Sequence, residues 1–279
     1  MADKSILITG CSSGLGADAA RTLHTRQGWR VFATCRKAED VARLRAEGLE
    51  SFVLDVADPD SIAIGMEEVL ARTGGTLDAL FNNAGYGLPG AVEDVPPDAL
   101  REIFETNVFG LHDLTRRAVA VMRTQGGHGR IVQHSSVLGR MSMRWRGAYT
   151  ATKHAVEGLT DTMRLELRGT DIHVVILNTG PVTSRFRINS IPMFEKWVNW
   201  QTSALAETYR SHLIRHLYEG IDRVPFQLDP PAVTARLIHA LETPRPRVRY
   251  FITTATYILE TARRILPQRS FDWLVAWAH

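Results

Sequence analysis

The sequence predicts an α/β fold in which one parallel β-sheet carries helices on both faces. Short runs rich in β-branched and apolar residues alternate with longer segments of helical spacing, starting at residue 5. Strands that are separated by helices pair in parallel, because each helix returns the chain to the same end of the sheet. A glycine-rich loop joins the first apolar run to the first helical segment, which supports the same arrangement.

The predicted strands are short runs bounded by turn residues. They cover residues 5–9, 30–35, 51–54, 77–81, 130–134, 173–177 and 249–253. Helical spacing covers residues 17–26, 39–47 and 148–168, and two further helices begin at Pro59 and Pro97. Proline is favoured in the first turn of a helix, and the stretch from Pro97 continues to about residue 124.

Composition bounds the class of protein. The chain has 279 residues, of which 44% are hydrophobic and 23% charged, and this excludes disordered and collagen-like classes. A net charge of +3 is too small for a protein that coats nucleic acid. Two cysteines, Cys11 and Cys35, cannot build a disulfide scaffold, so we expect a reducing compartment. No signal peptide is evident and no apolar run approaches the ~20 residues of a membrane span, so we expect a cytoplasmic protein.

Two regions are distinguished along the chain, a main domain and a C-terminal extension. Residues 1–253 are predicted to form a single domain, within which the segment 185–228 is rich in aromatic residues and has no clear pattern. Residues 254–279 are predicted to form an amphipathic helical extension. One apolar stripe is expected at Ile258, Leu259, Ala262, Ile265 and Leu266, with Glu260, Arg263 and Arg264 off it, and a second at Phe271, Leu274 and Trp277.

Two interpretations of this extension stay open. Its helices either pack on the body of the fold or on a subunit partner, or they contact an anionic membrane surface peripherally.

The glycine-rich loop is the first candidate binding site. It reads Thr9-Gly10-Cys11-Ser12-Ser13-Gly14-Leu15-Gly16 and lies between a strand and a helix. Such glycines also occur in purely structural turns. In this position they let the backbone approach a pyrophosphate, whose charge is stabilised by the helix N-terminus.

Further motifs follow in a fixed order along the chain. They are Asn82-Asn83-Ala84-Gly85, Asn107-Val108-Phe109-Gly110, Ser135-Ser136 and Tyr149-x-x-x-Lys153. With the glycine-rich loop, this set resembles the classical short-chain dehydrogenase/reductase family over roughly residues 4–253. The resemblance implies a Rossmann-type doubly wound sheet, a nicotinamide cofactor, and a helical substrate lid at residues 185–228.

The end of the second strand indicates which nucleotide binds. Folds that select NAD place an acid about 20 residues beyond the glycines, where it binds the ribose 2′-hydroxyl. This chain has Arg36 there with Lys37 beside it, and cations suit a 2′-phosphate. We therefore expect NADP(H) rather than NAD(H). The alternative is a solvated surface pair whose charge Glu39 and Asp40 partly offset.

The resemblance also implies the remaining cofactor contacts. The adenine side would be formed by Asp55 and Val56, and the nicotinamide ribose side by Asn83, Ala84 and Gly85. After the sixth strand, Thr179-Gly180 replaces the usual Pro-Gly, and Pro181, Val182 and Ser184 follow. The position of Ser184 often holds a threonine that contacts the carboxamide. The full cofactor set expected from the motifs is Gly10, Ser12, Ser13, Gly14, Leu15, Gly16, Arg36, Lys37, Asp55, Val56, Asn83, Ala84, Gly85, Tyr149, Lys153, Pro181, Val182 and Ser184.

The candidate catalytic residues are Asn107, Ser136, Tyr149 and Lys153. Tyr149 and Lys153 share one helix face, where an ammonium favours the phenolate and lowers the pKa of the tyrosine. Taken alone, a tyrosine and a lysine four residues apart usually lie on a helix surface without any functional role. By resemblance, Tyr149 exchanges a proton with the substrate oxygen, Ser136 hydrogen-bonds that oxygen, Lys153 also binds the ribose, and Asn107 holds a water in the proton relay. Asn107 could equally cap a helix kink.

Substrate contacts are expected from apolar residues near these motifs. They are Tyr86, Met143, Phe186, Phe194 and Trp197, together with Ser136 and Tyr149. Such a lining suits a hydrophobic aldehyde, ketone, steroid or retinoid, although the same residues could simply pack the lid. The chain looks closest to the branch of 17-beta-hydroxysteroid and retinol dehydrogenases and their bacterial aldehyde-reductase relatives.

Other functions are weighed against this reading. One is a non-catalytic NADP(H)-binding regulator, and a less favoured one is a nucleotide-sugar epimerase, which uses the same Tyr/Lys pair. A metal site is not expected, because His212 and His216 share a helix face without a completing acid. By resemblance the chain is expected to form a homodimer or homotetramer.

Overall fold

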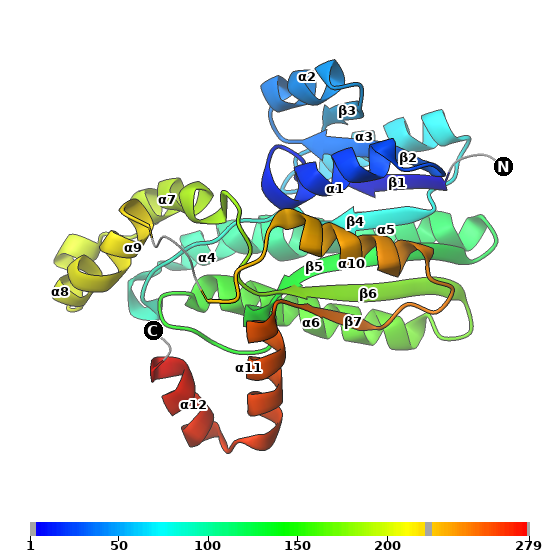
Figure 1. Cartoon of the computed structure of the whole chain (residues 1–279). Helices are drawn as coiled ribbons and strands as arrows, with labels where there is room; N and C mark the ends of the chain where they lie inside the picture. The colour runs from blue at the N-terminus through cyan, green and yellow to red at the C-terminus, as the bar shows by residue number, and fades with distance from the viewer. Residues whose placement is uncertain (1–3, 221–224, 278–279) are drawn as a thin grey trace.

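The computed structural model describes residues 4–220 and 225–277. All seven strands lie in one parallel sheet with the order β3-β2-β1-β4-β5-β6-β7 (Figure 1). This confirms the predicted fold class, and each strand lies where its apolar run predicts it. The strands are β1 Lys4–Ile8, β2 Trp29–Cys35, β3 Glu50–Val53, β4 Ala79–Asn82, β5 His128–Ser136, β6 Asp171–Thr179 and β7 Arg249–Ile252.

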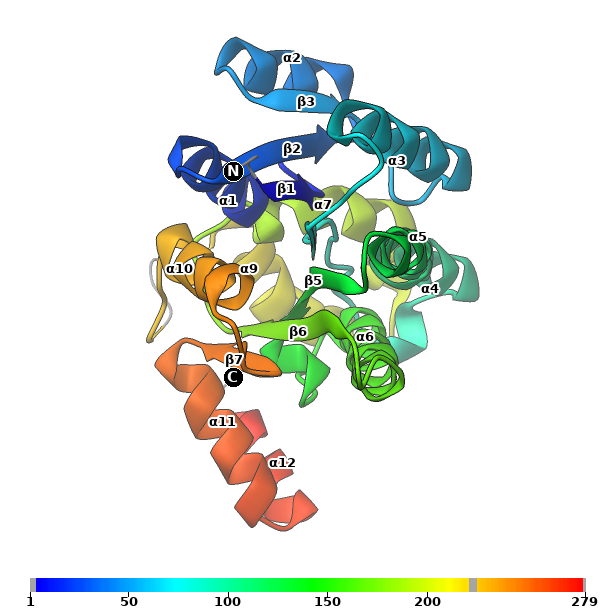
Figure 2. The same ribbon diagram turned by 90° about the vertical axis from the view of Figure 1, so that its right-hand side faces the viewer.

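Helices cover both faces of this sheet (Figure 2). One face packs against α1 and α10, and the other against α3, α5 and α6. The apolar runs of the strands are therefore buried from both sides, as expected for a parallel sheet. The main helices are α1 Gly14–Thr25, α2 Ala38–Ala46, α3 Pro59–Thr73, α4 Pro97–Phe104, α5 Leu111–Thr124, α6 Gly147–Glu166, α7 Phe186–Trp197, α8 Ala206–Thr208, α9 Arg215–Tyr218, α10 Pro230–Glu242, α11 Thr254–Ile265 and α12 Gln268–Trp277.

The long helix expected from Pro97 is interrupted in the middle. A π-helical segment, Glu105–Gly110, separates α4 from α5. Helical spacing in the sequence continues across it, so periodicity alone does not reveal the break. Gly110 packs against the loop after β3, where a side chain at this position would collide with the carbonyl oxygen of Val56. The π-helical segment brings Asn107 into a buried position, and such segments often occur at functional sites.

The segment expected as a lid forms α7, α8 and α9 with a second π-helical segment, Tyr209–Ile214. These elements lie beyond the carboxyl ends of the strands (Figure 1). Part of this region, residues 221–224, lies outside the described residues.

The C-terminal extension forms α11 and α12, which project beyond the β7 edge of the sheet (Figure 1). The predicted stripe is partly wrong, because Ile258 and Ile265 are 50% and 73% exposed. The other members of the two stripes pack near Leu138 and Met141; they are Leu259, Ala262, Leu266, Phe271 and Leu274. Trp277 begins the part of the chain whose side chains are not described.

Glu260 accounts for this rotation of α11. It is only 3% exposed, against the expectation that it faces solvent, because it forms ion pairs with Arg140 and Arg264, both at about 3 Å. The apolar side chains left exposed on the extension include Trp273. Whether they meet a subunit or a membrane stays a prediction from the sequence. In the described part of the chain, no helix is both long and apolar enough to cross a bilayer.

The close packing at Gly110 generates a stability prediction. Gly110→Ala forces a Cβ against the Val56 carbonyl, so we expect the free energy of unfolding to fall by about 3 kcal/mol. Urea denaturation followed by circular dichroism measures this change. Gly158→Ala is the control, because Gly158 lies in α6 with open space around its Cα, and alanine there should stabilise by about 0.5–1 kcal/mol. Equal effects of the two substitutions would contradict the packing argument.

Candidate active site

The predicted motifs meet at the carboxyl edge of the sheet. The glycine-rich loop follows β1, the Asn83 loop follows β4, Ser136 ends β5, and Pro181 follows β6. Because all strands are parallel, their carboxyl ends lie along one edge, which is where open α/β sheets bind ligands. The lid lies at the same edge (Figure 1).

The glycine-rich loop is packed tightly against the loop after β4. A side chain at Gly16 would collide with the Gly10 carbonyl, and one at Gly10 would lie 2.8 Å from the Ala84 Cα. Ser13 is the N-cap of α1, and its side chain forms no capping hydrogen bond. The first turn of α1 also contains no acidic residue. Its backbone N–H groups and the helix dipole are therefore oriented to bind an anion.

Asn83 connects this loop to the strands beside it. Its amide nitrogen donates to the carbonyl oxygens of Thr9 at 2.9 Å and Gly10 at 3.2 Å. The Thr9 hydroxyl in turn accepts from the backbone N–H groups of Asn83 and Ala84, both at 3.0 Å. Gly85 lies beside Asn107, with space too tight for a side chain. The loop after β4 is thereby held in one conformation.

Three cationic residues, Arg36, Lys37 and Arg43, lie near the glycine-rich loop, and the motifs did not indicate Arg43. Arg36 is exposed after β2, and no ion pair involves it in the described part of the chain. Lys37 pairs with Glu39 at 3.3 Å. Arg43 donates to the Ser12 carbonyl at 2.6 Å and pairs with Asp40 at 2.7 Å. Asp40 therefore offsets Arg43 and leaves the charge of Arg36 available.

The ends of β3 and β6 bring two more predicted segments to this region. Asp55 accepts from the backbone N–H of Ala57, and Val56 is buried below the π-helical segment. Ser184 lies close to Gly14 of the glycine-rich loop. Val182 pairs with Leu228 in an isolated bridge, which also connects Pro181 to the end of the lid.

Ser136, Tyr149 and Lys153 come together at the ends of β5 and α6. The Lys153 Nζ lies 5.6 Å from the centroid of the Tyr149 ring and donates to the His134 carbonyl at 2.6 Å. The Ser136 hydroxyl accepts from the Leu138 backbone N–H at 3.1 Å and donates to the Thr179 carbonyl at 3.4 Å, and its proximity lowers the pKa of the Tyr149 phenol. Lys153 is 5% exposed, so its charge is held in a nearly dry environment.

Burial sets the protonation of these groups. It raises the pKa of Tyr149 above its usual range, while the nearby Ser136 hydroxyl and the charge of Arg146 oppose the rise. The expected depression by Lys153 is thus not reached, and the phenol is protonated at neutral pH. Burial lowers the pKa of Lys153 to about 8, opposed by the charge of Glu157. Burial and Lys153 together lower the pKa of His134 to about 3, which keeps that ring neutral.

Asn107 ties the loop after β4 to α6. Its amide nitrogen donates to the Tyr86 carbonyl at 3.0 Å and to the Thr152 hydroxyl at 3.2 Å, and its oxygen accepts from the Tyr86 N–H at 3.1 Å. The side chain is 1% exposed. Because both ends of the amide are engaged, Asn107 positions its neighbours in this structure.

Comparison with known proteins identifies the family. The family model for short chain dehydrogenase matches residues 4–193. The chain belongs to the short-chain dehydrogenase family. It is similar to the uncharacterized oxidoreductase YbbO of Escherichia coli strain K12, with 37% identity over 96% of this chain and 93% of that protein. Human 17-beta-hydroxysteroid dehydrogenase type 1 is 32% identical over 91% of this chain and 78% of its own.

A solved structure agrees with this assignment. The crystal structure of a short-chain dehydrogenase from Streptomyces avermitilis superposes with a TM-score of 0.76 and 28% identity, over 99% of this chain and 96% of that one. The chain is therefore an NAD(P)-dependent oxidoreductase of this family.

The residues expected to contact substrate in this dehydrogenase fall into two groups. Phe186 meets the Tyr149 ring edge-on at 5.1 Å between centroids, and Met143 lines the cavity beside α6. In contrast, Phe194 is 1% exposed inside the lid, and the Trp197 indole N–H donates to Glu102 at 2.7 Å. The latter two pack the lid onto the body, which is the alternative that the sequence left open.

Tyr86 is partly buried after β4, and its hydroxyl has no hydrogen-bond partner among the described residues. No cluster of three metal-binding side chains occurs in the described part of the chain.

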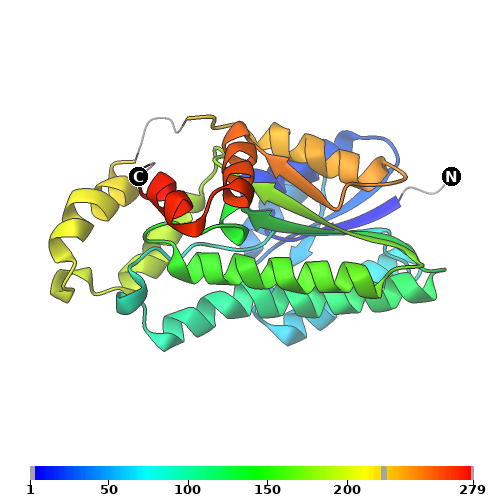
Figure 3. The same cartoon turned by 90° about the horizontal axis from the view of Figure 1, so that it is seen from below.

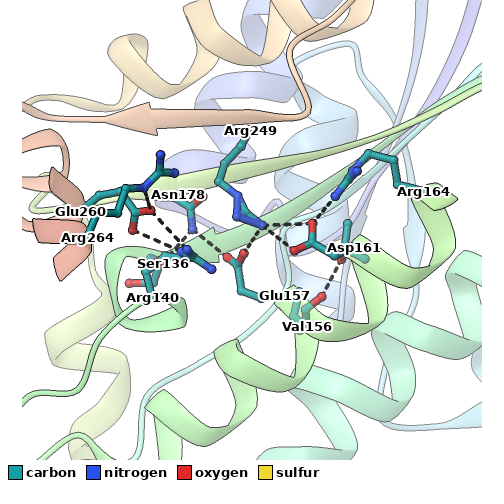
Figure 4. Close-up of polar contacts among 11 residues, drawn as sticks. Ser136, Arg140, Val156, Glu157, Asp161, Arg164, Asn178, Arg249, Glu260 and Arg264 are labelled. Atoms are coloured by element: carbon teal, nitrogen blue, oxygen red, sulfur yellow. Dashed lines mark hydrogen bonds and ion pairs between the residues drawn. The ribbon is translucent and has the colours of Figure 1, made fainter. Parts of the chain in front are cut away.

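A buried ionic network around Glu157 reaches the end of β5 at Ser136 (Figure 4). Glu157 is one helical turn beyond Lys153 and is 4% exposed. It pairs with Arg249 of β7 at 2.7 Å and accepts from the Asn178 amide at 2.7 Å. The same Asn178 nitrogen donates to the Ser136 carbonyl at 3.0 Å. The network thereby joins the backbone of Ser136 to the charge that faces Lys153.

Sequence reasoning missed Glu157, Asn178 and Arg249. The spacing of four residues after Lys153 was the available signal for Glu157, but acids at such positions usually face solvent. Asn178 and Arg249 come from β6 and β7, and only the pairing of these strands brings them to Glu157. Arg249 also contacts Asp161 at 3.1 Å, so one guanidinium serves two carboxylates on α6.

The position of Glu157 generates a pH prediction. The chain contains four lysines, Lys4, Lys37, Lys153 and Lys196, so NMR of lysine labelled with 15N and 13C gives few signals. We expect Lys153 to titrate near pH 8 in the free enzyme. Glu157→Gln removes a charge that favours the ammonium, so the pKa of Lys153 should fall by about half a unit or more.

The matched control for this titration is Asp161→Asn. Asp161 shares Arg249 but lies one turn farther along α6, with a side chain 42% exposed, so its removal should move the pKa much less. Equal shifts in both variants, or none in Glu157→Gln, would show that Glu157 does not set the charge of Lys153.

Proposed function

We propose that this dehydrogenase uses NADP(H) to transfer a hydride between the nicotinamide and a hydrophobic carbonyl or alcohol. The observation that carries the proposal is the grouping of Ser136, Tyr149 and Lys153 beside the glycine-rich loop. A regulator that only bound the cofactor would have no use for a buried lysine and tyrosine held together at considerable desolvation cost.

The residues around the glycine-rich loop fit a dinucleotide. The first turn of α1 has backbone N–H groups without a side-chain cap, which suits a pyrophosphate. A side chain at Gly16 would collide with the Gly10 carbonyl, so the start of α1 lies very close to the loop that precedes it. Arg36 supports a 2′-phosphate, because it is exposed and lacks an acidic partner among the described residues. When bound, the nicotinamide supplies the hydride chemistry.

The protein residues supply the proton and the orientation. Tyr149 donates its phenolic proton to the carbonyl oxygen, which its raised pKa allows by keeping the phenol protonated. Ser136 donates a hydrogen bond to the same oxygen and polarises it. The Lys153 ammonium favours the phenolate that forms after transfer, and Asn107 keeps α6 fixed to the loop after β4.

Removing the phenolic proton tests the catalytic assignment. Tyr149→Phe should lower kcat for NADPH-dependent aldehyde reduction by about 10³-fold or more, because the Ser136 hydroxyl that also contacts the carbonyl oxygen is a much weaker acid than the phenol. Absorbance of NADPH at the nicotinamide band reports turnover, and quenching of tryptophan fluorescence reports NADPH binding. Binding should be retained. A variant that turns over at a near-normal rate would refute the role of Tyr149.

The charge at Arg36 tests the cofactor assignment. Arg36→Asp replaces a cation by an anion beside the 2′-phosphate, so the ratio of kcat/KM for NADPH over NADH should fall by about 100-fold or more. Arg36→Lys keeps the charge and should retain most of the preference. If the wild type uses NADH as well as NADPH, or if Arg36→Asp leaves the ratio unchanged, Arg36 does not select the cofactor.

A further inference from the structure

A large cavity lies beside the helix that carries Tyr149. Its volume is about 1140 Å³, and it is lined by residues 140–146, the second half of the lid and α12, with His154 of α6 and Arg263 of α11. Figure 3 shows α12, in red, at the same end of the molecule as the lid, and residues of both line the cavity. Residues 140–146 lead directly into α6, three residues before Tyr149. Ser136, Tyr149 and Lys153 are not among the lining residues, so the cavity adjoins them through residues 140–146 and suits only a part of the substrate remote from the reacting carbonyl.

One wall of this cavity is apolar. Side chains from three separate segments provide it, namely Met141, Met143, Trp145, Leu213, Phe271 and Val275. Such a wall suits an aliphatic or ring system, in line with the proposed hydrophobic substrate.

The remaining lining is strongly cationic. The described lining residues include five arginines but only two acids, and histidines are also present. Two of these arginines are neutralised, since Arg140 pairs with Glu260 and Arg215 pairs with Glu219, each at 3.2 Å. Of the acids, Asp272 accepts from the Gln268 amide at 2.7 Å.

Three arginines remain without an acidic partner in the described part of the chain: Arg144, Arg146 and Arg263. Arg144 lies over the Trp145 ring at 5.2 Å from its centroid, and Arg263 is exposed. These two sit where they can attract an anion from solvent.

Arg146 is the most unusual of the three. It is the N-cap residue of α6, it is half-buried where it lines the cavity, and partial desolvation there lowers the pKa of its guanidinium. Its side chain forms no hydrogen bond or ion pair with any described residue, although a guanidinium carries five N–H donors. A desolvated cation without a partner is costly, and the first turn of α6 contains no acid to compensate it. An anion that entered the cavity would supply the missing partner.

We infer that this cavity binds the distal end of the substrate and that Arg146 recognises a carboxylate there. The preferred substrates are then apolar carbonyl compounds whose far end is a carboxylate, such as oxo acids with a hydrocarbon chain. A planar guanidinium matches a carboxylate with two parallel hydrogen bonds, and the adjoining helix N-terminus favours the same charge. This inference rests on the proposed reductase function and adds the class of its substrate.

The first experiment compares each ω-oxo carboxylic acid with its methyl ester, over a series of chain lengths, as substrates with NADPH. The ester keeps the aldehyde and the chain but removes the charge. We expect kcat/KM for the acid to exceed that for the ester by about tenfold or more at the best length, as for a charged hydrogen-bonded pair. Arg146→Gln should bring this ratio close to one.

The acid-to-ester ratio is measured within each variant, so a general loss of activity or stability cancels. Arg101→Gln is the control, because Arg101 is exposed on α4 and pairs only with Asp98; its ratio should match that of the wild type. Equal rates for acid and ester in the wild type overturn the inference and leave the reductase function intact. An acid-to-ester ratio in Arg146→Gln that equals the wild-type ratio also overturns the inference.

A second measurement does not require turnover. A saturated fatty acid of the best chain length should raise the Tm of the wild type, whereas the corresponding alcohol should not, and Arg146→Gln should abolish the difference. If no aldehyde is reduced but the acid still stabilises the wild type through Arg146, the proposed reaction fails while the anion site stands. If the acid and the alcohol act alike, the anion site fails.

Discussion

The pairing of β5 with β6 is the interaction on which the site depends. It is the longest pairing in the sheet and runs in register from His128 opposite Asp171 to Ser136 opposite Thr179. A shift by one residue would turn Ser136 to the opposite face of the sheet. This register fixes the His134 carbonyl that holds Lys153 and the Asn178 amide that holds Ser136. The helix between the two strands, α6, is thereby positioned against both.

Buried charge gives the site its chemical character. Lys153, Glu157 and Glu260 are each 5% exposed or less, and each has a partner within the protein. Removing such groups from water costs several kcal/mol, and the partners return only part of it. These ion pairs and hydrogen bonds therefore fix the positions of the side chains more than they raise the free energy of unfolding. Arg146 differs from these groups because its partner is missing from the described protein, and this contrast singles it out.

Much of the fold could be predicted because its signals are local. β-Branched runs, the glycine-rich loop and the prolines at Pro59 and Pro97 each encode one element without reference to the rest of the chain. The spacing of Tyr149 and Lys153 likewise follows from one helix. The π-helical segment was not predictable in this way, because helical spacing continues through Asn107 while the break is imposed by contact with the Val56 carbonyl.

The remaining differences also arise from long-range contacts. Glu260 was assigned to the solvent side because charged residues usually are, yet Arg140, 120 residues earlier, draws it inward. Glu157 was overlooked for the same reason, since its partner Arg249 belongs to another strand. Phe194 and Trp197 were expected beside the substrate because they lie in the segment that the family resemblance implies is a lid, and in the structure they pack this segment onto the body. Residue type predicts that a side chain will be buried, but only the tertiary fold determines which residues it packs against.

The place of Arg249 in the chain has a consequence for how the enzyme matures. Synthesis proceeds from the N-terminus, so Ser136, Tyr149 and Lys153 all emerge from the ribosome well before the strand that carries Arg249. Until that strand docks as the last of the sheet, Glu157 faces the interior without its guanidinium. The Glu157 carboxylate therefore has its ion pair only after β7 has been synthesised and has paired with β6.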